Sequence, residues 1–244
     1  MIALFTDYSL SGPYVGLLKA VFAQHCPEVK VLDVCHDLPA FDPEAASYLL
    51  TASLGSIPSQ AIIVGVVDPG VGSQREALWL TLDGQHFIGP NNGLFTQSMV
   101  RAKTCEAREL LFDQDAVSQS FHGRDVFAPA AADLINSQTP VHRKIANEKL
   151  VLTTRSSTPN STKVIYIDGF GNCMLSVWRE ELSVDTEVKT EEQTLLFART
   201  FSEVNPGDSF WYFNSLGLVE VACREGSAAE ELDLKIGSEL SFQS

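Results

Sequence analysis

The first 75 residues alternate between short apolar runs and segments with a helical period. Apolar side chains recur every three to four positions over residues 12–25, and a mostly apolar segment follows Pro43 to residue 54, so two helices are expected. Apolar, β-branched runs that predict buried strands lie at residues 2–5, 29–34 and 62–67. Strands that alternate with helices of this length imply βαβ units. We therefore expect an N-terminal α/β domain with a doubly wound, Rossmann-like parallel sheet.

The pattern changes after residue 75. Two apolar runs, at residues 77–82 and 86–88, flank Asp83-Gly84, and this dipeptide between such runs is typical of a tight β-hairpin. Helical patterns follow at residues 94–100 and 126–135, the second with Pro129 early in it, and a strand pattern lies at 107–112.

A polar stretch rich in Ser, Thr, Asn and Pro runs from residue 136 to residue 160, and we expect the domain boundary there. The predicted organisation is an N-terminal domain of residues 1–140, a linker of residues 141–160 and a C-terminal domain of residues 161–244. Helical periodicity fades beyond the linker. Short strand-like runs separated by turns, typical of an antiparallel β-barrel, lie at residues 163–167, 174–178, 194–197, 209–213, 218–222 and 239–242.

Composition narrows the class of protein. The chain has 244 residues, 45% of them hydrophobic and 20% charged, which is ordinary for a globular protein with a sizeable core. Its formal net charge of −14 argues against a nucleic-acid-binding surface, which needs clustered Lys and Arg. No apolar run reaches the roughly 18 residues that a membrane span requires, so no membrane partner is expected.

The cysteines and the N-terminus bear on location. Five scattered cysteines, odd in number and never spaced as CxxC, favour reduced thiols over disulfides or a zinc site. The first residues, MIALFTDYSLSG, lack the basic start and long apolar core of a signal peptide. We therefore expect a cytoplasmic protein.

Asp68 is the first candidate for chemistry. It ends the apolar run at residues 62–67, and Pro69, Gly70 and Gly72 then force a tight loop. Ligands of open α/β sheets bind beyond the carboxyl ends of the strands, which is where Asp68 stands. Arg75 follows on the same loop, close enough to pair with this carboxylate. The alternative is a structural Asp that caps the loop backbone.

Three further candidates lie on loops or at strand ends, and each has a structural alternative. Asp7 follows the first strand and also suits a helix cap, and His122 also suits a hydrogen-bonded loop histidine. Asp168, in the segment DGFGN, also suits a turn between two strands.

Taken together, the segments around these residues resemble a known family. FTDY, VVDPGVGSQR, GPNNGL, FHGRDVFAPAAA, IDGFGN and FNSLGLVEVA occur in this order. They resemble the S-adenosylmethionine hydroxide adenosyltransferases, relatives of the fluorinase and chlorinase enzymes, over nearly the whole chain. The resemblance implies an α/β domain followed by a β-barrel, in agreement with the boundary expected above.

The resemblance also implies a reaction. Water or hydroxide attacks the ribose 5′ carbon of S-adenosylmethionine, methionine leaves, and adenosine forms, with no metal and no other cofactor. The family's water-binding set corresponds to Asp68, Arg75 and His122. The sulfonium leaves readily as a neutral thioether, so the enzyme must chiefly orient and polarise water. Our hypothesis is that cationic Arg75 and His122 favour developing hydroxide, while Asp68 orients them and accepts a hydrogen bond or proton.

Substrate contacts are implied in the same way. Asp7 matches the residue that holds the ribose hydroxyls, Asp168 the one that binds the amino group of the methionine part, and Ser215 the one that binds its carboxylate. Adenine contacts are implied for Asn172 at the ring edge, for Phe170 and Phe201 at the ring faces, and for backbone near Cys223 and Glu225. The family usually forms homotrimers with each site between neighbouring protomers.

Two departures bear on the choice among relatives. The halogenating members carry Tyr where Asp68 and His122 stand, and a carboxylate at Asp68 would repel a halide in a desolvated pocket. Leu216 replaces an aromatic residue or Arg, which leaves carboxylate binding to Ser215 and backbone groups.

We therefore predict an S-adenosylmethionine hydrolase. One alternative is an enzyme of the same fold that uses chloride or another halide as nucleophile, and a second is a protein that binds S-adenosylmethionine or adenosine without turnover. A metal-dependent hydrolase is a weaker alternative, since the five histidines show no paired ligand spacing.

Overall fold

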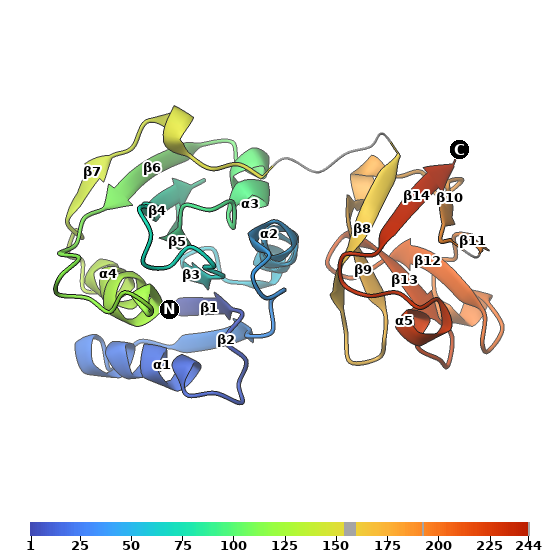
Figure 1. Cartoon of the computed structure of the whole chain (residues 1–244), viewed down its shortest axis with the longest axis horizontal. Helices are drawn as coiled ribbons and strands as arrows, with labels where there is room; N and C mark the ends of the chain where they lie inside the picture. Colours follow the sequence, from blue (N-terminus) through green and yellow to red (C-terminus); the bar gives the residue numbers. More distant parts are fainter. Residues whose placement is uncertain (154–159, 192, 244) are drawn as a thin grey trace. The chain divides into compact units, whose positions relative to one another are not determined.

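The structure, a computed structural model, describes residues 1–153, 160–191 and 193–243. The chain divides into two compact units, Met1–Thr153 and Thr154–Ser244, and each is described by itself. Figure 1 shows the first in blue through green to yellow and the second in darker yellow through orange to red.

The first unit is built on a mixed sheet. The strand order is β2-β1-β3-β5-β4-β6-β7. Its strands are β1 (Ile2–Thr6), β2 (Val31–Cys35), β3 (Ile62–Val66), β4 (Ala77–Leu82), β5 (Gln85–Pro90), β6 (Cys105–Leu110) and β7 (His142–Lys144). The pairs among β2, β1, β3 and β5 are parallel, and those among β5, β4, β6 and β7 are antiparallel.

The expectation of a parallel sheet is therefore confirmed for β2, β1, β3 and β5 and wrong for the pairs that involve β4, β6 and β7. Asp83 and Gly84 both have positive φ, 47° and 86°, which is the geometry of a type I′ turn that folds β4 directly back on β5. This turn was expected from the sequence. Because β5 then joins β3 in parallel, a hairpin is inserted into what began as a βαβ sheet.

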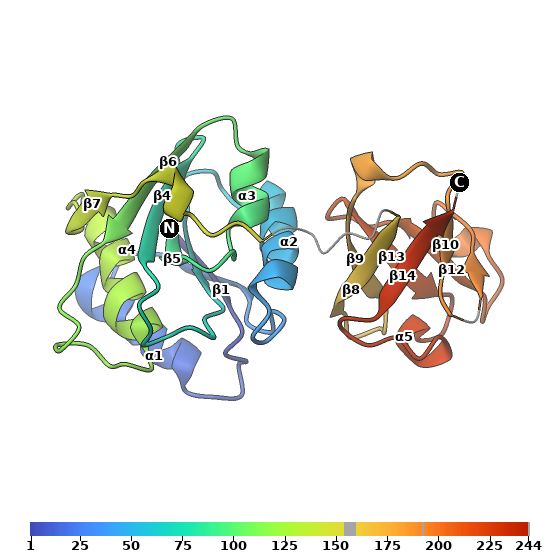
Figure 2. The same cartoon turned by 45° about the horizontal axis from the view of Figure 1, so that its top comes forward.

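Helices cover both faces of the sheet (Figures 1 and 2). Helix α1 (Tyr14–His25) and helix α4 (Ala128–Ile135) pack on the face that carries Ile2, Leu4 and Val64. Leu50 of α2 (Pro43–Ser53) lies against Gly65 of β3, which faces the other way because side chains alternate along a strand. The remaining helical elements of this unit are η1 (Leu54–Ser56), α3 (Thr96–Arg101), the π-turn η2 (Gly123–Phe127) and η3 (Asn147–Lys149).

The expected linker differs from the structure at its start. Residues 142–144 form β7, which pairs with β6 through Arg108↔Lys144 and Leu110↔His142, so they extend the sheet of the first unit. Three residues are too short for a periodic signal, and the polar composition suggested a connection instead. Residues 154–159 of the expected linker lie outside the described part of the chain.

The second unit is an antiparallel, nearly closed barrel-like sheet. Its strand order is β11-β10-β14-β8-β9-β13-β12, and every pair along it is antiparallel. An isolated bridge between Phe197 and Trp211 nearly closes the ends, and the Trp211 indole is fully buried. The elements are β8 (Ser161–Ile167), β9 (Cys173–Trp178), η4 (Arg179–Glu181), β10 (Glu187–Lys189), β11 (Thr194–Leu195), η5 (Phe201–Glu203), β12 (Ser209–Phe213), β13 (Leu218–Cys223), α5 (Ala228–Glu231) and β14 (Glu239–Gln243).

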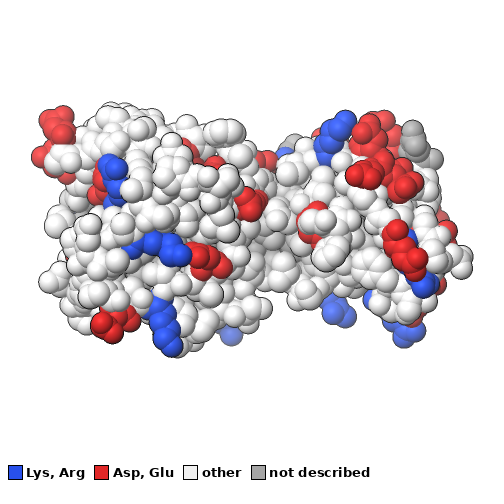
Figure 3. Space-filling model, turned by 90° about the horizontal axis from the view of Figure 1, so that it is seen from below, with Lys and Arg blue, Asp and Glu red and all other residues white. Residues whose placement is uncertain are grey.

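Among the described residues, no helix is both long and apolar enough to cross a membrane. On the face shown in Figure 3, Lys and Arg side chains lie singly or beside Asp and Glu rather than in one basic patch.

Candidate active site

The structure brings Asp68, Arg75 and His122 into one hydrogen-bonded group. Asp68 stands two residues beyond the end of β3, Arg75 lies at the other end of the following loop, and His122 directly precedes η2. The Arg75 guanidinium donates from Nε to Asp68 Oδ1 at 2.9 Å and from Nη2 to Asp68 Oδ2. Nη2 also donates to His122 Nδ1 at 2.9 Å.

The Asp68–Arg75 pair is nearly removed from solvent. Only 6% of the Asp68 side chain and 9% of the Arg75 side chain are exposed. A buried ion pair gains little net stability, because the attraction is offset by the cost of desolvating both charges. Its bidentate geometry does, however, fix the direction of both side chains. We therefore infer that the main effect of the pair is to orient the Asp68 and Arg75 side chains.

Gly72 explains how the Asp68–Arg75 loop meets the segment that carries His122. Its φ of +77° lies in the left-handed region that favours glycine. A Cβ at this position would also approach the carbonyl oxygen of Gln119 much closer than the 3.0 Å below which real Cβ atoms are essentially never found. The two backbones can therefore touch only because residue 72 has no side chain.

The surroundings of His122 favour the neutral imidazole over the cationic one of our hypothesis. Burial lowers its pKa below the ordinary value, and the positive charge of Arg75 lowers it further, against the opposing charges of Asp68 and Asp125. Because Arg75 always donates, Nδ1 of His122 must accept, and the ring proton lies on Nε2. The ring is 4% exposed, and Nε2 is buried without a hydrogen-bond partner among the described residues.

The backbone around His122 is irregular. The chain from Gly123 to Phe127 forms a π-turn before α4 begins, and Pro129 in the first turn of α4 has no N–H to donate. The ring of Phe112 packs edge-on against His122, with centroids 5.2 Å apart. These contacts set the direction of the imidazole ring.

Asp7 lies near the same group. It follows β1, which pairs with β3 in parallel, so Asp7 and Asp68 leave the same edge of the sheet at neighbouring strands. Burial raises the pKa of Asp7, and the charge of Asp68 adds to the rise, although hydrogen bonds from the backbone of Phe41 and of Asp7 itself lower it. The adjacent Tyr8 also has a raised pKa, first through burial and then through the charges of Asp7 and Asp68.

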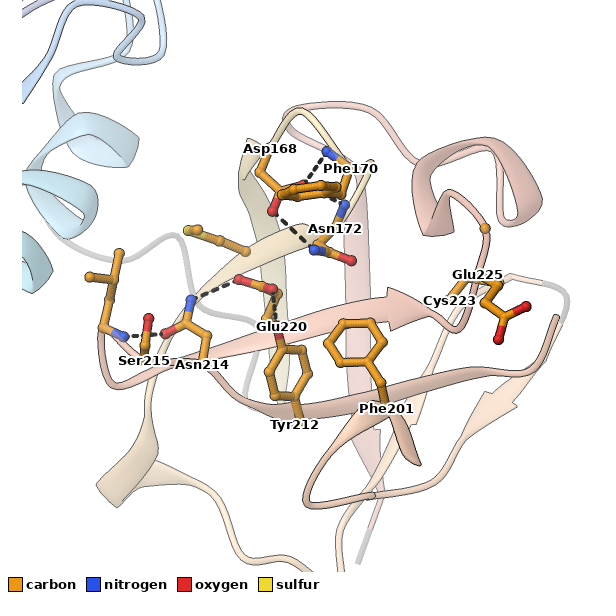
Figure 4. A pocket seen from close by; sticks show the side chains of 13 residues that line it. Asp168, Phe170, Asn172, Phe201, Tyr212, Asn214, Ser215, Glu220, Cys223 and Glu225 are labelled. Carbon is orange, nitrogen blue, oxygen red and sulfur yellow. Dashed lines mark hydrogen bonds between the residues drawn. The ribbon is translucent and has the colours of Figure 1, made fainter. Parts of the chain in front are cut away.

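The second group of predicted residues surrounds a cavity of about 880 Å³ in the barrel unit (Figure 4). All seven residues to which the resemblance assigns a contact in this domain line it, namely Asp168, Phe170, Asn172, Phe201, Ser215, Cys223 and Glu225. The structure thus collects the predicted residues into two groups, one in each unit.

Asp168 has the structural role that was its alternative interpretation. Its Oδ1 accepts from the backbone N–H groups of Phe170 and Asn172, both at 2.9 Å, and its Oδ2 accepts from Asn172 Nδ2 at 2.9 Å. It therefore caps the turn between β8 and β9. The same turn leaves the Phe170 ring 82% exposed at the rim of the cavity.

The cavity residues that the sequence reasoning missed include Tyr212, Asn214 and Glu220. Glu220 is 2% exposed and accepts hydrogen bonds from the other two. A signal was present, because the carboxylate of Glu220 interrupts the apolar strand LVEVAC, where an ionisable side chain has to be buried.

The cavity carries negative charge. Its lining includes Asp168, Glu220 and Glu225 and contains no Lys, Arg or His among the described residues. Such a site favours a cationic ligand over an anionic one. In the described part of the chain, the cavity included, no three His, Cys, Asp or Glu side chains are grouped so that they could hold a metal ion.

Comparison with known proteins gives matches to one family along nearly the whole chain. The SAM hydroxide adenosyltransferase N-terminal domain matches residues 2–143, and the C-terminal domain of the same family matches residues 162–241. The chain is 36% identical to the (R)-S-adenosyl-L-methionine hydrolase of Thermus thermophilus, over 97% of this chain and 96% of that protein. The protein of the same name from Salinispora arenicola is 33% identical over 98% and 96%.

A more distant relative and two solved structures also match this chain over nearly its full length. A fluorinase of Actinopolyspora mzabensis is 26% identical over 97% of this chain and 95% of its own. A crystal structure of a conserved protein of Thermotoga maritima superposes with a TM-score of 0.89 at 27% identity, covering both chains fully. A crystal structure of a conserved protein of Thermus thermophilus gives a TM-score of 0.81 at 34% identity over 99% of both chains. By its two domains, their order and its full-length relatives, the chain belongs to the S-adenosylmethionine hydroxide adenosyltransferase family.

Proposed function

We propose that this protein hydrolyses S-adenosyl-L-methionine to adenosine and L-methionine. The observation that carries the proposal is the buried Nε2–H of His122, which has no partner among the described residues and lies beside a bidentate Asp68–Arg75 pair. A buried donor without a partner is costly and marks a place where a ligand atom completes the site. The relatives named (R)-S-adenosyl-L-methionine hydrolase support the same reaction.

We propose a role for each of the three side chains, on the basis of their hydrogen bonds. His122 donates from Nε2 to the oxygen of the attacking water, and Arg75 supplies the positive charge that stabilises developing hydroxide. Nδ1 of His122 already accepts from Arg75, so it is not free to take the proton of the water. Asp68 takes that proton, because each of its carboxylate oxygens uses only one lone pair on Arg75.

The bond changes are simple. The water oxygen forms a bond to the ribose 5′ carbon while the bond from that carbon to sulfur breaks, and the electron pair stays on sulfur. The sulfonium thereby becomes the neutral thioether of methionine. Because this leaving group needs no proton, we propose that the reaction uses no metal and no other cofactor.

The cavity suits the rest of the substrate. S-adenosylmethionine carries a sulfonium and an ammonium against one carboxylate, so it is a net cation and fits the acidic lining. The rings of Phe170 and Phe201 offer faces for adenine. Asn172 donates its amide N–H to Asp168, which leaves its Oδ1 for the exocyclic amino group of adenine.

The other contacts follow the family resemblance. We propose that Asp7 accepts hydrogen bonds from the two ribose hydroxyls, that Asp168 binds the amino group and that Ser215 binds the carboxylate. Backbone groups at Cys223 and Glu225 complete adenine binding. We also propose a homotrimer in which neighbouring protomers supply the two groups of residues to one site, and a cytoplasmic location, since the five cysteines are free thiols.

Incubation in ¹⁸O-enriched water tests the reaction. The purified protein is given S-adenosylmethionine without halide and with a chelator, and adenosine and methionine are followed by chromatography and mass spectrometry. We expect adenosine labelled at its 5′ oxygen. Bound but unreacted substrate would support the binding-protein alternative, product that needs added chloride would support the halide-using alternative, and loss of activity with the chelator would support a metal-dependent hydrolase.

A further inference from the structure

Glu220 is a carboxylate at the floor of the cavity to which the reaction assigns no role. It lies in the middle of β13, directly opposite Tyr212 of β12 and Met174 of β9, and all three residues line the cavity. With 2% of its surface exposed, Glu220 is one of the few buried charged residues in the described part of the chain. Figure 4 shows its carboxylate between the side chains of Asn214 and Tyr212.

Both oxygens of Glu220 are occupied by neighbours. Asn214 Nδ2 donates to Oε2 at 2.8 Å, and the Tyr212 hydroxyl donates to Oε1. Burial raises the pKa of Glu220, and the charge of Asp168 adds to the rise, against the lowering effect of these two hydrogen bonds. Burying this carboxylate costs free energy that an apolar side chain at the same position would not. We therefore look for the role of Glu220 in its two hydrogen bonds.

Asn214 transmits the hydrogen bond to the backbone of a turn. Its Oδ1 accepts from the N–H groups of Leu216 and Leu218, both at 3.0 Å, and its backbone pairs with Leu218 at 2.9 Å. Gly217, with φ of +81°, completes the turn. The amide of Asn214 can hold the turn only with its oxygen toward these N–H groups, and the bond to Glu220 excludes the flipped orientation.

We propose that Glu220 is a positioning residue that fixes the amide of Asn214 and thereby shapes the turn of residues 214–218, the part of the cavity wall that presents Ser215 and Leu216. This inference rests on the proposed function, because Ser215 is there assigned to the carboxylate of the methionine part. Glu220 accordingly sets affinity for ligands that carry the amino-acid part, and it does so through Asn214 rather than by touching the ligand.

Calorimetry with two ligands tests the proposal. S-adenosylhomocysteine has the amino-acid part but no sulfonium to displace, and adenosine lacks the amino-acid part altogether. We expect Glu220→Ala to weaken S-adenosylhomocysteine binding about tenfold or more, since it releases a buried amide, while adenosine binds as in the wild type. In the hydrolysis assay KM should rise while kcat changes much less.

Two further variants separate position from charge. Glu220→Gln should bind nearly as well as the wild type, because its amide oxygen can accept from Asn214 while its NH₂ donates to the Tyr212 oxygen. Asn214→Ala should reproduce the loss seen with Glu220→Ala, and the double variant should be no worse than either, as expected for residues that act in series.

Glu181→Ala is the matched control. Glu181 accepts from the backbone of Trp178 at 2.7 Å in the same unit and does not line the cavity. It should lower thermal stability without changing the affinity for either ligand.

Three results would overturn the proposal. An equal loss of affinity for both ligands in Glu220→Ala would indicate that Glu220 has a general role in the barrel. If Glu220→Gln bound S-adenosylhomocysteine as weakly as Glu220→Ala, the charge itself would act on the ligand. Unchanged affinity in Asn214→Ala would show that Glu220 does not act through the turn. If Glu220→Ala does not fold, Asn214→Ala and Glu220→Gln decide by the same criteria. Failure of the wild type to form adenosine would count against the proposed function alone, because these binding measurements need no turnover.

Discussion

Replacing Gly72 by alanine should separate Arg75 from His122 without touching either residue. The substitution adds one methyl group where the loop of residues 68–75 meets the backbone of Gln119. His122 stands three residues beyond Gln119, and Arg75 three residues beyond Gly72. A displacement at this contact therefore acts directly on the 2.9 Å hydrogen bond between Arg75 Nη2 and His122 Nδ1.

The Gly72→Ala substitution should affect both the stability of the fold and the rate of the reaction. An alanine at a positive φ costs about 1 kcal/mol of folding free energy, because its Cβ crowds the backbone. The new Cβ must also retreat from the Gln119 carbonyl oxygen by roughly half an ångström or more to reach a contact found in real structures. A misplacement on the order of 1 Å can cost about 100-fold in rate, so we expect kcat to fall by roughly one to two orders of magnitude.

Gly84→Ala is the matched control. Gly84 also has positive φ, +86°, but no atom lies within 4 Å of the position a Cβ would take. In denaturant unfolding, Gly84→Ala should lose only the cost of a positive φ, while Gly72→Ala should lose more because its Cβ also meets the Gln119 carbonyl oxygen. Only Gly72→Ala should lose activity in an adenosine-release assay at saturating S-adenosylmethionine. A normal kcat in Gly72→Ala, or an equal loss in Gly84→Ala, would refute the reasoning.

Three further predictions concern the proposed site. Because burial and Arg75 lower the pKa of His122, kcat should be constant from neutral to mildly alkaline pH and should fall at lower pH with a midpoint below 6.5. His122→Asn should be about 100-fold slower or worse, and its kcat should no longer show this fall at low pH. A midpoint above 6.5 in the wild type would contradict a neutral imidazole. Asp7→Ala should weaken adenosine binding in calorimetry, and unchanged affinity would count against ribose recognition. Asp68→Ala and Asp168→Ala should each be inactive or nearly so, yet activity should return when the two are unfolded, mixed and refolded together; no recovery would contradict sites shared between protomers.

Local chemistry explains what was predicted well. The strand before Asp68, the Asp83-Gly84 hairpin and the short strands of the barrel follow from side-chain periodicity and turn residues, which act over a few positions along the chain. The same local signals located Asp7, Asp68 and Asp168 at the ends of strands or in turns. Family resemblance added the six other barrel residues that the structure places with Asp168 around one cavity.

The sequence by itself therefore determined most of the helices and strands and the two-domain division, and together with the family resemblance it supplied the candidate residues. Only the tertiary structure decided that the first sheet is mixed, that burial and Arg75 lower the pKa of His122, and that Glu220 accepts a hydrogen bond from Asn214 at the cavity. These properties depend on contacts between distant positions, such as Arg75 with His122, and on the removal of water from charged groups. The neighbouring residues in the sequence do not specify which strand pairs with which, or how deeply a side chain is buried. Both properties arise only when separate segments of the chain pack together.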